Sequence, residues 1–161
     1  MKTIFVIRHA KALPENINLP DMNRPVSEIG KERTKNVAKY IIENNCSCQL
    51  MLSSNATRAQ QTAQIIAPAL NCKNLIIESS LYLTNLTAYF NILFEQEDSI
   101  DKIAIVGHNP GITEFANYFL TEKIWSMPTS AVLCIDIAAD KWIDITMATH
   151  KKRFFVTPKT L

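Results

Sequence analysis

The chain has 161 residues, of which 47% are hydrophobic and 20% are charged, and its formal net charge is only +2. This composition is typical of one globular domain with its own core, which we expect to span residues 1–161. The small net charge argues against an extensive basic surface for nucleic acid. No window is long and apolar enough to cross a bilayer, so we expect no membrane partner either.

The first apolar run follows Lys2 and stops at Arg8, which is too short for a secretory signal. We therefore expect a cytoplasmic protein. In a reducing compartment its cysteines are predicted to be free thiols. Two of them form a C-x-C pair with no second pair at zinc-ligand spacing, so we expect neither a metal nor a cofactor. The four cysteines are Cys46, Cys48, Cys72 and Cys134.

Short apolar runs alternate with longer amphipathic ones along the chain. The short runs predict strands at Thr3–Ile7, Leu50–Ser53, Leu75–Ile77, Ile103–Val106, Ala131–Ile137 and Trp142–Met147. Apolar residues at helical spacing predict helices over Arg33–Asn44, Ala59–Leu70, Leu86–Phe94 and Ile112–Phe119. In the first helix, Val37, Ile41 and Ile42 are expected to face inward.

Strands that alternate with helices imply crossover connections, and therefore a mostly parallel sheet. The predicted fold is α/β, a three-layer sandwich with helices on both faces of the central sheet. The segment Ala138–Lys141 has the length of a hairpin connection, which leaves room for one antiparallel edge strand.

Polar residues follow three of the predicted strands, at the carboxyl ends where ligands of open α/β sheets bind. The first strand delivers Arg8 and His9, the second delivers Ser53–Arg58, and the fourth delivers Gly107–Gly111, which includes a histidine. The third histidine, His150, lies beside the basic cluster at 151–153. We interpret both as solvated surface features.

The residues at these strand ends are suited to an anion. Arg8 and Arg58 offer planar donor groups that match phosphate oxygens. Ser54 or Asn55 is predicted to cap the helix that carries Arg58, and Asn109-Pro110 has the pattern of an N-cap followed by proline, so two helix N-termini face the same edge. Each piece alone is typical of an ordinary strand end or turn. Their recurrence on three strands indicates phosphoryl transfer, in which a histidine can be the nucleophile when neutral or stabilise charge when protonated.

The same residues resemble a known family. Arg8-His9, Ser53–Ala63 and Gly107-His108 resemble the motifs of the histidine phosphatase superfamily, whose fold is phosphoglycerate-mutase-like. Further stretches resemble the SixA-type phosphohistidine phosphatases over nearly the whole chain, and these are Arg8–Lys11, Asp21–Gly30, Val106–Gly111, Met127–Ser130 and Thr157–Leu161.

The resemblance implies a role for each matching residue. His9 is expected to be the nucleophile that carries a transient phosphoryl group. Arg8, Arg58 and His108 are expected to bind the phosphoryl oxygens. No metal is implied, because positive side chains replace Mg²⁺ in neutralising the developing charge.

Four more residues are expected near the substrate. The resemblance places Arg24 and Ser27 in a loop over the pocket, with Thr129 and Ser130 close to it. Two structural alternatives stay open, because Ser27 is equally suited to a helix N-cap and Arg24 to a surface ion pair.

The sequence departs from many relatives in one respect. They place an acidic proton donor soon after the third strand, at a position that Ser80 occupies here. Glu78 is the only carboxylate nearby and is the candidate general acid, although a glutamate at a strand end is more often simply solvated.

We therefore expect a phosphatase that hydrolyses phosphohistidine on a partner protein through a covalent phosphohistidine intermediate and releases inorganic phosphate. One alternative keeps the chemistry but takes a small phosphomonoester as substrate. Another is a non-catalytic phosphate-binding module. The small number of insertions favours an open pocket, which suits a protein substrate.

Overall fold

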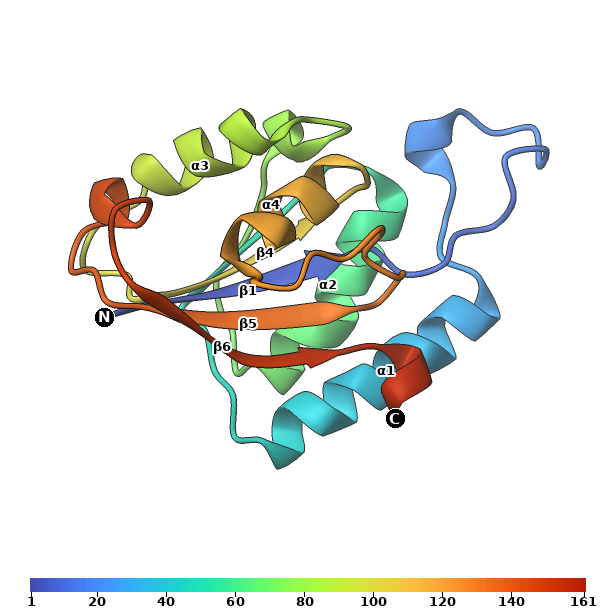
Figure 1. Ribbon diagram of the computed structural model, residues 1–161. Helices are drawn as coiled ribbons and strands as arrows, with labels where there is room; N and C mark the ends of the chain where they lie inside the picture. The colour runs from blue at the N-terminus through green and yellow to red at the C-terminus, as the bar shows by residue number, and fades with distance from the viewer.

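A six-stranded β-sheet forms the centre of the molecule, which a computed structural model describes from residue 1 to residue 161 (Figure 1). Its strands are β1 (Lys2–Arg8), β2 (Leu50–Ser53), β3 (Leu75–Ile77), β4 (Lys102–Gly107), β5 (Val132–Ile137) and β6 (His150–Val156). They lie in the order β3-β2-β4-β1-β5-β6. The first four in this order are parallel, whereas β5 and β6 add an antiparallel edge. The predicted α/β fold with a mostly parallel sheet is confirmed.

The four predicted helices are present. Ser27 is the N-cap of the first helix, because its Oγ accepts a hydrogen bond from the Gly30 N–H at 3.1 Å. Val37 and Ile41 are buried as expected, but Ile42 lies one position further round this helix and is 59% exposed. No helix has the length and apolar character needed to cross a membrane. The helices are α1 (Glu28–Glu43), α2 (Thr57–Ala69), α3 (Leu86–Phe94) and α4 (Gly111–Phe119).

The helices form one layer on each face of the sheet (Figure 1). Successive side chains of a strand point to opposite faces, so β1 supplies both layers. Phe5 and Ile7 pack with α1 and α2, whereas Ile4 and Val6 pack with α3 and α4. Because β1 is covered on both sides, its apolar run is continuous rather than alternating.

The last predicted strand, over Trp142–Met147, is wrong. This segment contains a 3-10 helix, Trp142–Asp144, and it is apolar because Trp142 and Ile145 are fully buried in the core on the α3 and α4 side. The strand that pairs with β5 is instead β6, which begins only at His150, so the connection runs over 138–149. The basic residues at 151–153 are exposed, as expected for an edge strand.

The carboxyl ends of the parallel strands meet at one edge of the sheet. Arg8 at the end of β1 is in register with Gly107 at the end of β4, and Ser53 of β2 is in register with Val106 of β4. A side chain on Gly107 would collide with the hydroxyl of Tyr89 on α3, so only glycine fits there. The polar residues that follow these strands are therefore held side by side.

Candidate active site

Hydrogen bonds from neighbouring strands fix the backbone at the end of β1. The Arg8 N–H donates to the Ala131 carbonyl at 3.2 Å, and the His9 N–H donates to the Gly107 carbonyl at 3.1 Å. The Ser130 N–H donates in turn to the His9 carbonyl at 3.2 Å. His9 is thus held from both sides by the sheet and has little freedom to move.

The His9 imidazole is arranged as a nucleophile. Its Nδ1 lies 2.7 Å from the Ala10 carbonyl, which can only accept, so the ring proton is on Nδ1. Nε2 then carries the lone pair and accepts a bond of 3.4 Å from Arg58 Nε. Burial lowers the pKa of His9 to about 3, with help from the nearby His108, Arg58 and Arg8 and against the Ala10 carbonyl. The ring is therefore neutral at neutral pH.

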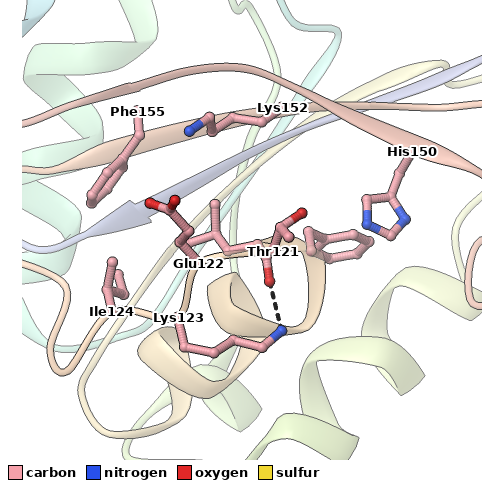
Figure 2. A pocket seen from close by; sticks show the side chains of 9 residues that line it. Thr121, Glu122, Lys123, Ile124, His150, Lys152 and Phe155 are labelled. Atoms are coloured by element: carbon pink, nitrogen blue, oxygen red, sulfur yellow. Dashed lines mark hydrogen bonds between the residues drawn. The ribbon is translucent and has the colours of Figure 1, made fainter.

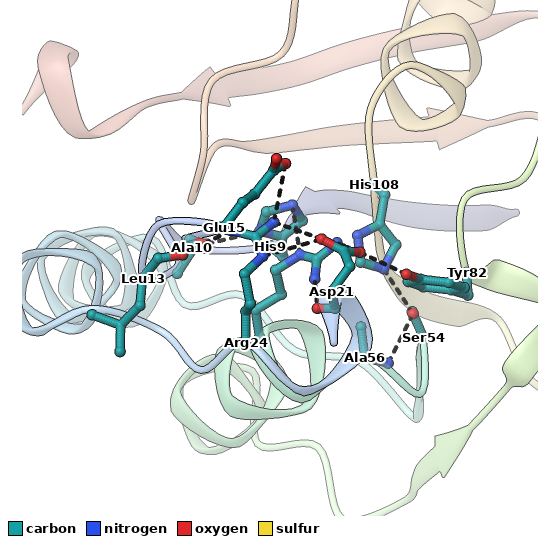
Figure 3. Close-up of polar contacts among 11 residues, drawn as sticks. His9, Ala10, Leu13, Glu15, Asp21, Arg24, Ser54, Ala56, Tyr82 and His108 are labelled. Atoms are coloured by element: carbon teal, nitrogen blue, oxygen red, sulfur yellow. Dashed lines mark hydrogen bonds and ion pairs between the residues drawn. The ribbon is translucent and has the colours of Figure 1, made fainter. Parts of the chain in front are cut away.

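His108 lies against His9, with 4.9 Å between the ring centroids. Its Nε2 is 2.7 Å from Ser54 Oγ, and its Nδ1 is buried without a partner (Figure 3). Burial and the Arg58 guanidinium lower the pKa of His108 to about 4. If the Ser54 hydroxyl donates to Nε2, Nδ1 carries the proton. An unpaired buried N–H of this kind is suited to a ligand oxygen.

The two arginines at the edge are largely buried. Arg8 Nη1 donates to the Met127 carbonyl at 2.7 Å, but its Nε is buried without a partner. Burial and the nearby Arg58 lower the pKa of Arg8. Two guanidinium groups, of which Arg8 has an unpaired Nε, therefore converge with two neutral imidazoles, and such a group favours a bound anion.

Asp21 is an unexpected member of this site. Its carboxylate accepts hydrogen bonds from the Tyr82 hydroxyl at 2.6 Å, from Arg24 Nη2 at 2.7 Å and from Arg58 Nη2 at 3.0 Å (Figure 3). The Asp21 carbonyl accepts a further bond of 2.7 Å from Arg58 Nη1. The phenol and the two guanidinium groups hold the pKa of Asp21 well below its usual range, so the carboxylate is ionised at neutral pH.

These groups open into a cavity of about 660 Å³. Four basic side chains and two acidic ones, Glu15 and Asp21, line it. Leu19 and Leu83 add apolar surface, and both are exposed. The lining thus has more basic than acidic side chains, and the basic residues are Arg8, Lys11, Arg24 and Arg58.

A second cavity, of about 520 Å³, lies between the end of α4 and β6 and is remote from these groups (Figure 2). It contains His150 and two lysines, Lys123 and Lys152, and Lys123 Nζ donates to the carbonyls of Asn117 and Leu120, both at 2.6 Å. This contact satisfies the last carbonyls of α4. Lys123 therefore has a structural role in this cavity.

The structure separates the four secondary candidates into two pairs. Arg24 and Thr129 line the 660 Å³ cavity. Ser27 does not, because it caps α1 and donates to the Lys11 carbonyl at 2.9 Å. Ser130 is buried against Thr34 at 2.8 Å, so the expectation that these two serines face substrate is not supported by their positions.

The candidate acid Glu78 is also outside the cavity. Its Oε1 accepts bonds from the Ser80 N–H at 3.2 Å and the Ser80 hydroxyl at 2.5 Å, which caps the 3-10 helix Ser79–Leu81. Its role in the structure is therefore local. No group of three or more histidine, cysteine or acidic residues is arranged to hold a metal ion.

The predicted helix caps at the edge need correction. The N-cap of α2 is Ala56, and Ser54 Oγ accepts from its N–H at 3.2 Å instead of capping the helix. The N-cap of α4 is Pro110, and Asn109 Oδ1 accepts from the Thr113 hydroxyl at 2.5 Å. Both helices still begin at the edge of the sheet where His9 lies.

Sequence reasoning missed Asp21 and Tyr82. Asp21 lies in a long connection without periodicity, and only its proximity to Arg24 in the sequence is a signal. Tyr82 follows the third strand near the place where an acid was sought, and its ring packs edge-on to His108 at 5.5 Å between centroids. The contact between Asp21 and Tyr82 is formed only in the folded chain.

Known proteins share both the sequence pattern and the fold. Residues 4–82 match the histidine phosphatase superfamily, branch 1. The chain is 30% identical over 115 residues to an uncharacterised protein of a Picosynechococcus strain, and the match covers 70% of each chain.

Two solved structures extend the comparison. The protein named phosphohistidine phosphatase SixA from Agrobacterium tumefaciens superposes with a TM-score of 0.83 and 22% identity, over 98% of both chains. The protein named α-ribazole-5'-P phosphatase from Escherichia coli superposes with a TM-score of 0.69 and 15% identity, also over 98% of both chains. At these identities the superpositions establish the shared fold.

Proposed function

Because the chain belongs to the histidine phosphatase superfamily and is therefore a phosphatase, we propose that it hydrolyses phosphohistidine on a partner protein. In this reaction His9 carries the phosphoryl group transiently, and inorganic phosphate is the product. The name of the Agrobacterium protein supports this substrate class by similarity.

The proposed first step transfers the phosphoryl group to His9. The phosphoryl oxygens bind Arg8 and Arg58, which line the cavity, and the free Nδ1 of His108, which lies against His9. Nε2 of His9 attacks phosphorus, while the bond from phosphorus to the substrate nitrogen breaks and its electron pair stays on that nitrogen. The Ala10 carbonyl holds the proton on Nδ1 of His9 throughout, which stabilises the phosphorylated ring as a cation.

The proposed second step releases phosphate. Water attacks phosphorus, the bond to His9 Nε2 breaks, and the ring departs as a neutral imidazole because Nδ1 has kept its proton. The water proton leaves with the phosphate product or passes to solvent. No metal takes part, since the guanidinium groups of Arg8 and Arg58 oppose the negative charge.

One observation carries the choice of substrate, namely the state of the two acidic candidates. Glu78 lies outside the cavity, and Asp21 is inside but held ionised by Tyr82, Arg24 and Arg58. Neither candidate supplies the proton that an alkoxide leaving group needs, and the third carboxylate at the cavity, Glu15, has a side chain that is 86% exposed. Imidazole, whose conjugate acid has a pKa of about 6.5, departs without one if its ring is already protonated.

A second candidate function is the hydrolysis of a small phosphomonoester. It is favoured by the similarity to the protein named α-ribazole-5'-P phosphatase, and the cavity of about 660 Å³ has room for such a molecule. The same four residues serve both reactions, so the leaving group decides between them.

A turnover assay tests the proposal. The wild-type protein is given a phosphohistidine-bearing protein, an alkyl phosphate and an aryl phosphate at matched concentrations, with His9→Ala as the inactive control. We expect kcat/KM to be highest for phosphohistidine and lowest for the alkyl phosphate. Faster hydrolysis of the alkyl phosphate would favour the small phosphomonoester instead.

A further inference from the structure

We propose that Asp21 determines the preference for phosphohistidine, because its carboxylate binds the protonated ring of the leaving imidazole. This inference rests on the proposed function and deepens it. It assigns a task to a carboxylate that binds Arg58 but that no step of the proposed reaction uses.

The position of Asp21 suits this task. Its Oδ2 is 3.0 Å from Arg58 Nη2, and Nε of the same guanidinium is 3.4 Å from Nε2 of His9. The carboxylate is therefore one guanidinium group away from the nucleophile, within the same cavity. Its side chain is 39% exposed, so part of it is accessible to a ligand there. In an in-line transfer the leaving ring lies on the side of phosphorus away from His9, within the cavity that Asp21 also lines.

The chemistry distinguishes two kinds of leaving group. A phosphohistidine ring carries phosphorus on one nitrogen and, when protonated, a hydrogen on the other. An ionised carboxylate beside that N–H keeps the proton on the ring, so the imidazole leaves neutral when the N–P bond breaks. An alkyl phosphate has no such N–H, and the charge of Asp21 opposes the alkoxide that forms. The Asp21 carboxylate thus favours the phosphohistidine substrate and disfavours the alkyl phosphate.

The nucleophile already shows the same arrangement on the other side of phosphorus. Nδ1 of His9 donates to the Ala10 carbonyl at 2.7 Å, so this ring also keeps a proton on the nitrogen that is not phosphorylated. The proposed transfer passes phosphorus between two imidazoles, each with an oxygen acceptor on its remote nitrogen. Ala10 serves the enzyme's ring, and Asp21 serves the substrate's ring.

The charged neighbours of Asp21 define what a pH measurement will report. They come from its own segment, from the preceding connection, from α2, from the segment after β3 and from the ends of β1 and β4. These groups are Arg24, Glu15, Arg58, Tyr82, Arg8, His9 and His108. Arg24, Arg58 and Tyr82 bind the carboxylate directly, so its negative charge is maintained in the pH range of the assay.

The test compares Asp21→Asn with the wild type on two substrates. One is a phosphohistidine-bearing protein, and the other is p-nitrophenyl phosphate, whose leaving group needs no proton. Loss of an opposite charge lowers the pKa of the bound ring by about one to three units. We therefore expect kcat for phosphohistidine to fall about tenfold or more at alkaline pH, with its alkaline limb moved to lower pH. Turnover of p-nitrophenyl phosphate should be equal or higher, because a negative charge has left the phosphate site.

Three further variants test whether the effect is specific to the charge of Asp21. Asp21→Glu keeps the charge and should restore much of the preference. Tyr82→Phe removes the phenol hydrogen bond but keeps the carboxylate, so the ratio between the substrates should be retained. Glu78→Gln removes a carboxylate outside the cavity and should leave both rates unchanged.

Two outcomes would overturn the inference while leaving the proposed function intact. An equal fall for both substrates in Asp21→Asn would mean that Asp21 only positions Arg58. An equal rise would mean that it only competes with phosphate for Arg58. A wild-type protein that hydrolyses p-nitrophenyl phosphate but not phosphohistidine would instead overturn the proposed function, and this inference with it.

Discussion

Acidification from about pH 7 to about pH 4.5 should destabilise the folded protein through His9 and His108. Their pKa values are about 3 and about 4 in the folded protein, against 6.5 ordinarily. Below about pH 6.5 the unfolded chain therefore binds more protons than the native state, so the free energy of unfolding falls as the pH falls. At about pH 4.5 the loss is about 2.5 kcal/mol for each ring, or about 5 kcal/mol together. This is as large as the whole stability of a marginal domain, about 5 kcal/mol.

Urea unfolding at a series of pH values, in buffers without phosphate or sulfate, measures this effect. His9→Ala and His108→Ala should each lose about half of the pH dependence between these limits, since each removes one of the two linked protons. His150→Ala is the matched control, because it replaces a histidine at an exposed position on β6, away from the site. If all three variants keep the wild-type dependence, the two imidazoles are not held neutral in the native protein, and their assignment as unprotonated groups is wrong.

Three other predictions concern single residues. His9→Ala should stay folded but lose essentially all turnover, and labelled substrate should leave an acid-labile adduct on the wild type alone; an adduct on a serine or cysteine would refute the assignment. Arg58→Lys should lower kcat/KM by about 10²–10³-fold, because an ammonium group lacks the planar donors that match phosphate, and vanadate binding should weaken in parallel. Gly107→Ala should cost about 1–3 kcal/mol in urea unfolding through its collision with the Tyr89 hydroxyl, and Tyr89→Phe in the same chain should recover part of that loss.

Residues that lie in regular elements could be predicted from the sequence. β1 is a continuous apolar run because helices cover both faces of the sheet, and its end marks the position of His9. The parallel register then brings His108 beside it without further information. Arg58 follows because α2 begins directly after β2, at the same edge. The grouping of these three side chains thus depends on local pattern and on the rule that strand ends meet.

The errors arose where apolar character and secondary structure are not coupled. The apolar Trp142 is explained by its complete burial in the core and not by a position in a strand. Its indole N–H donates to the Ile100 carbonyl at 2.8 Å. β6 was missed because an edge strand with one pairing partner tolerates a charged sequence. Asp21 was missed because the contact with Arg58 is 37 residues apart in the chain, which no local pattern reports.

Some residues of the site lie on regular secondary structure and others on a connection, and this division has an evolutionary consequence. The backbone of Arg8 and His9 is fixed by the sheet, and Arg58 is fixed on a buried face of α2. Asp21 and Arg24 lie instead on the connection between β1 and α1, where substitutions and insertions are better tolerated. Changes in this connection can therefore alter the proposed leaving-group preference while Arg8, His9 and Arg58 keep their positions. The connection between β1 and α1 can thus vary separately from the strands and the helix that carry the other site residues.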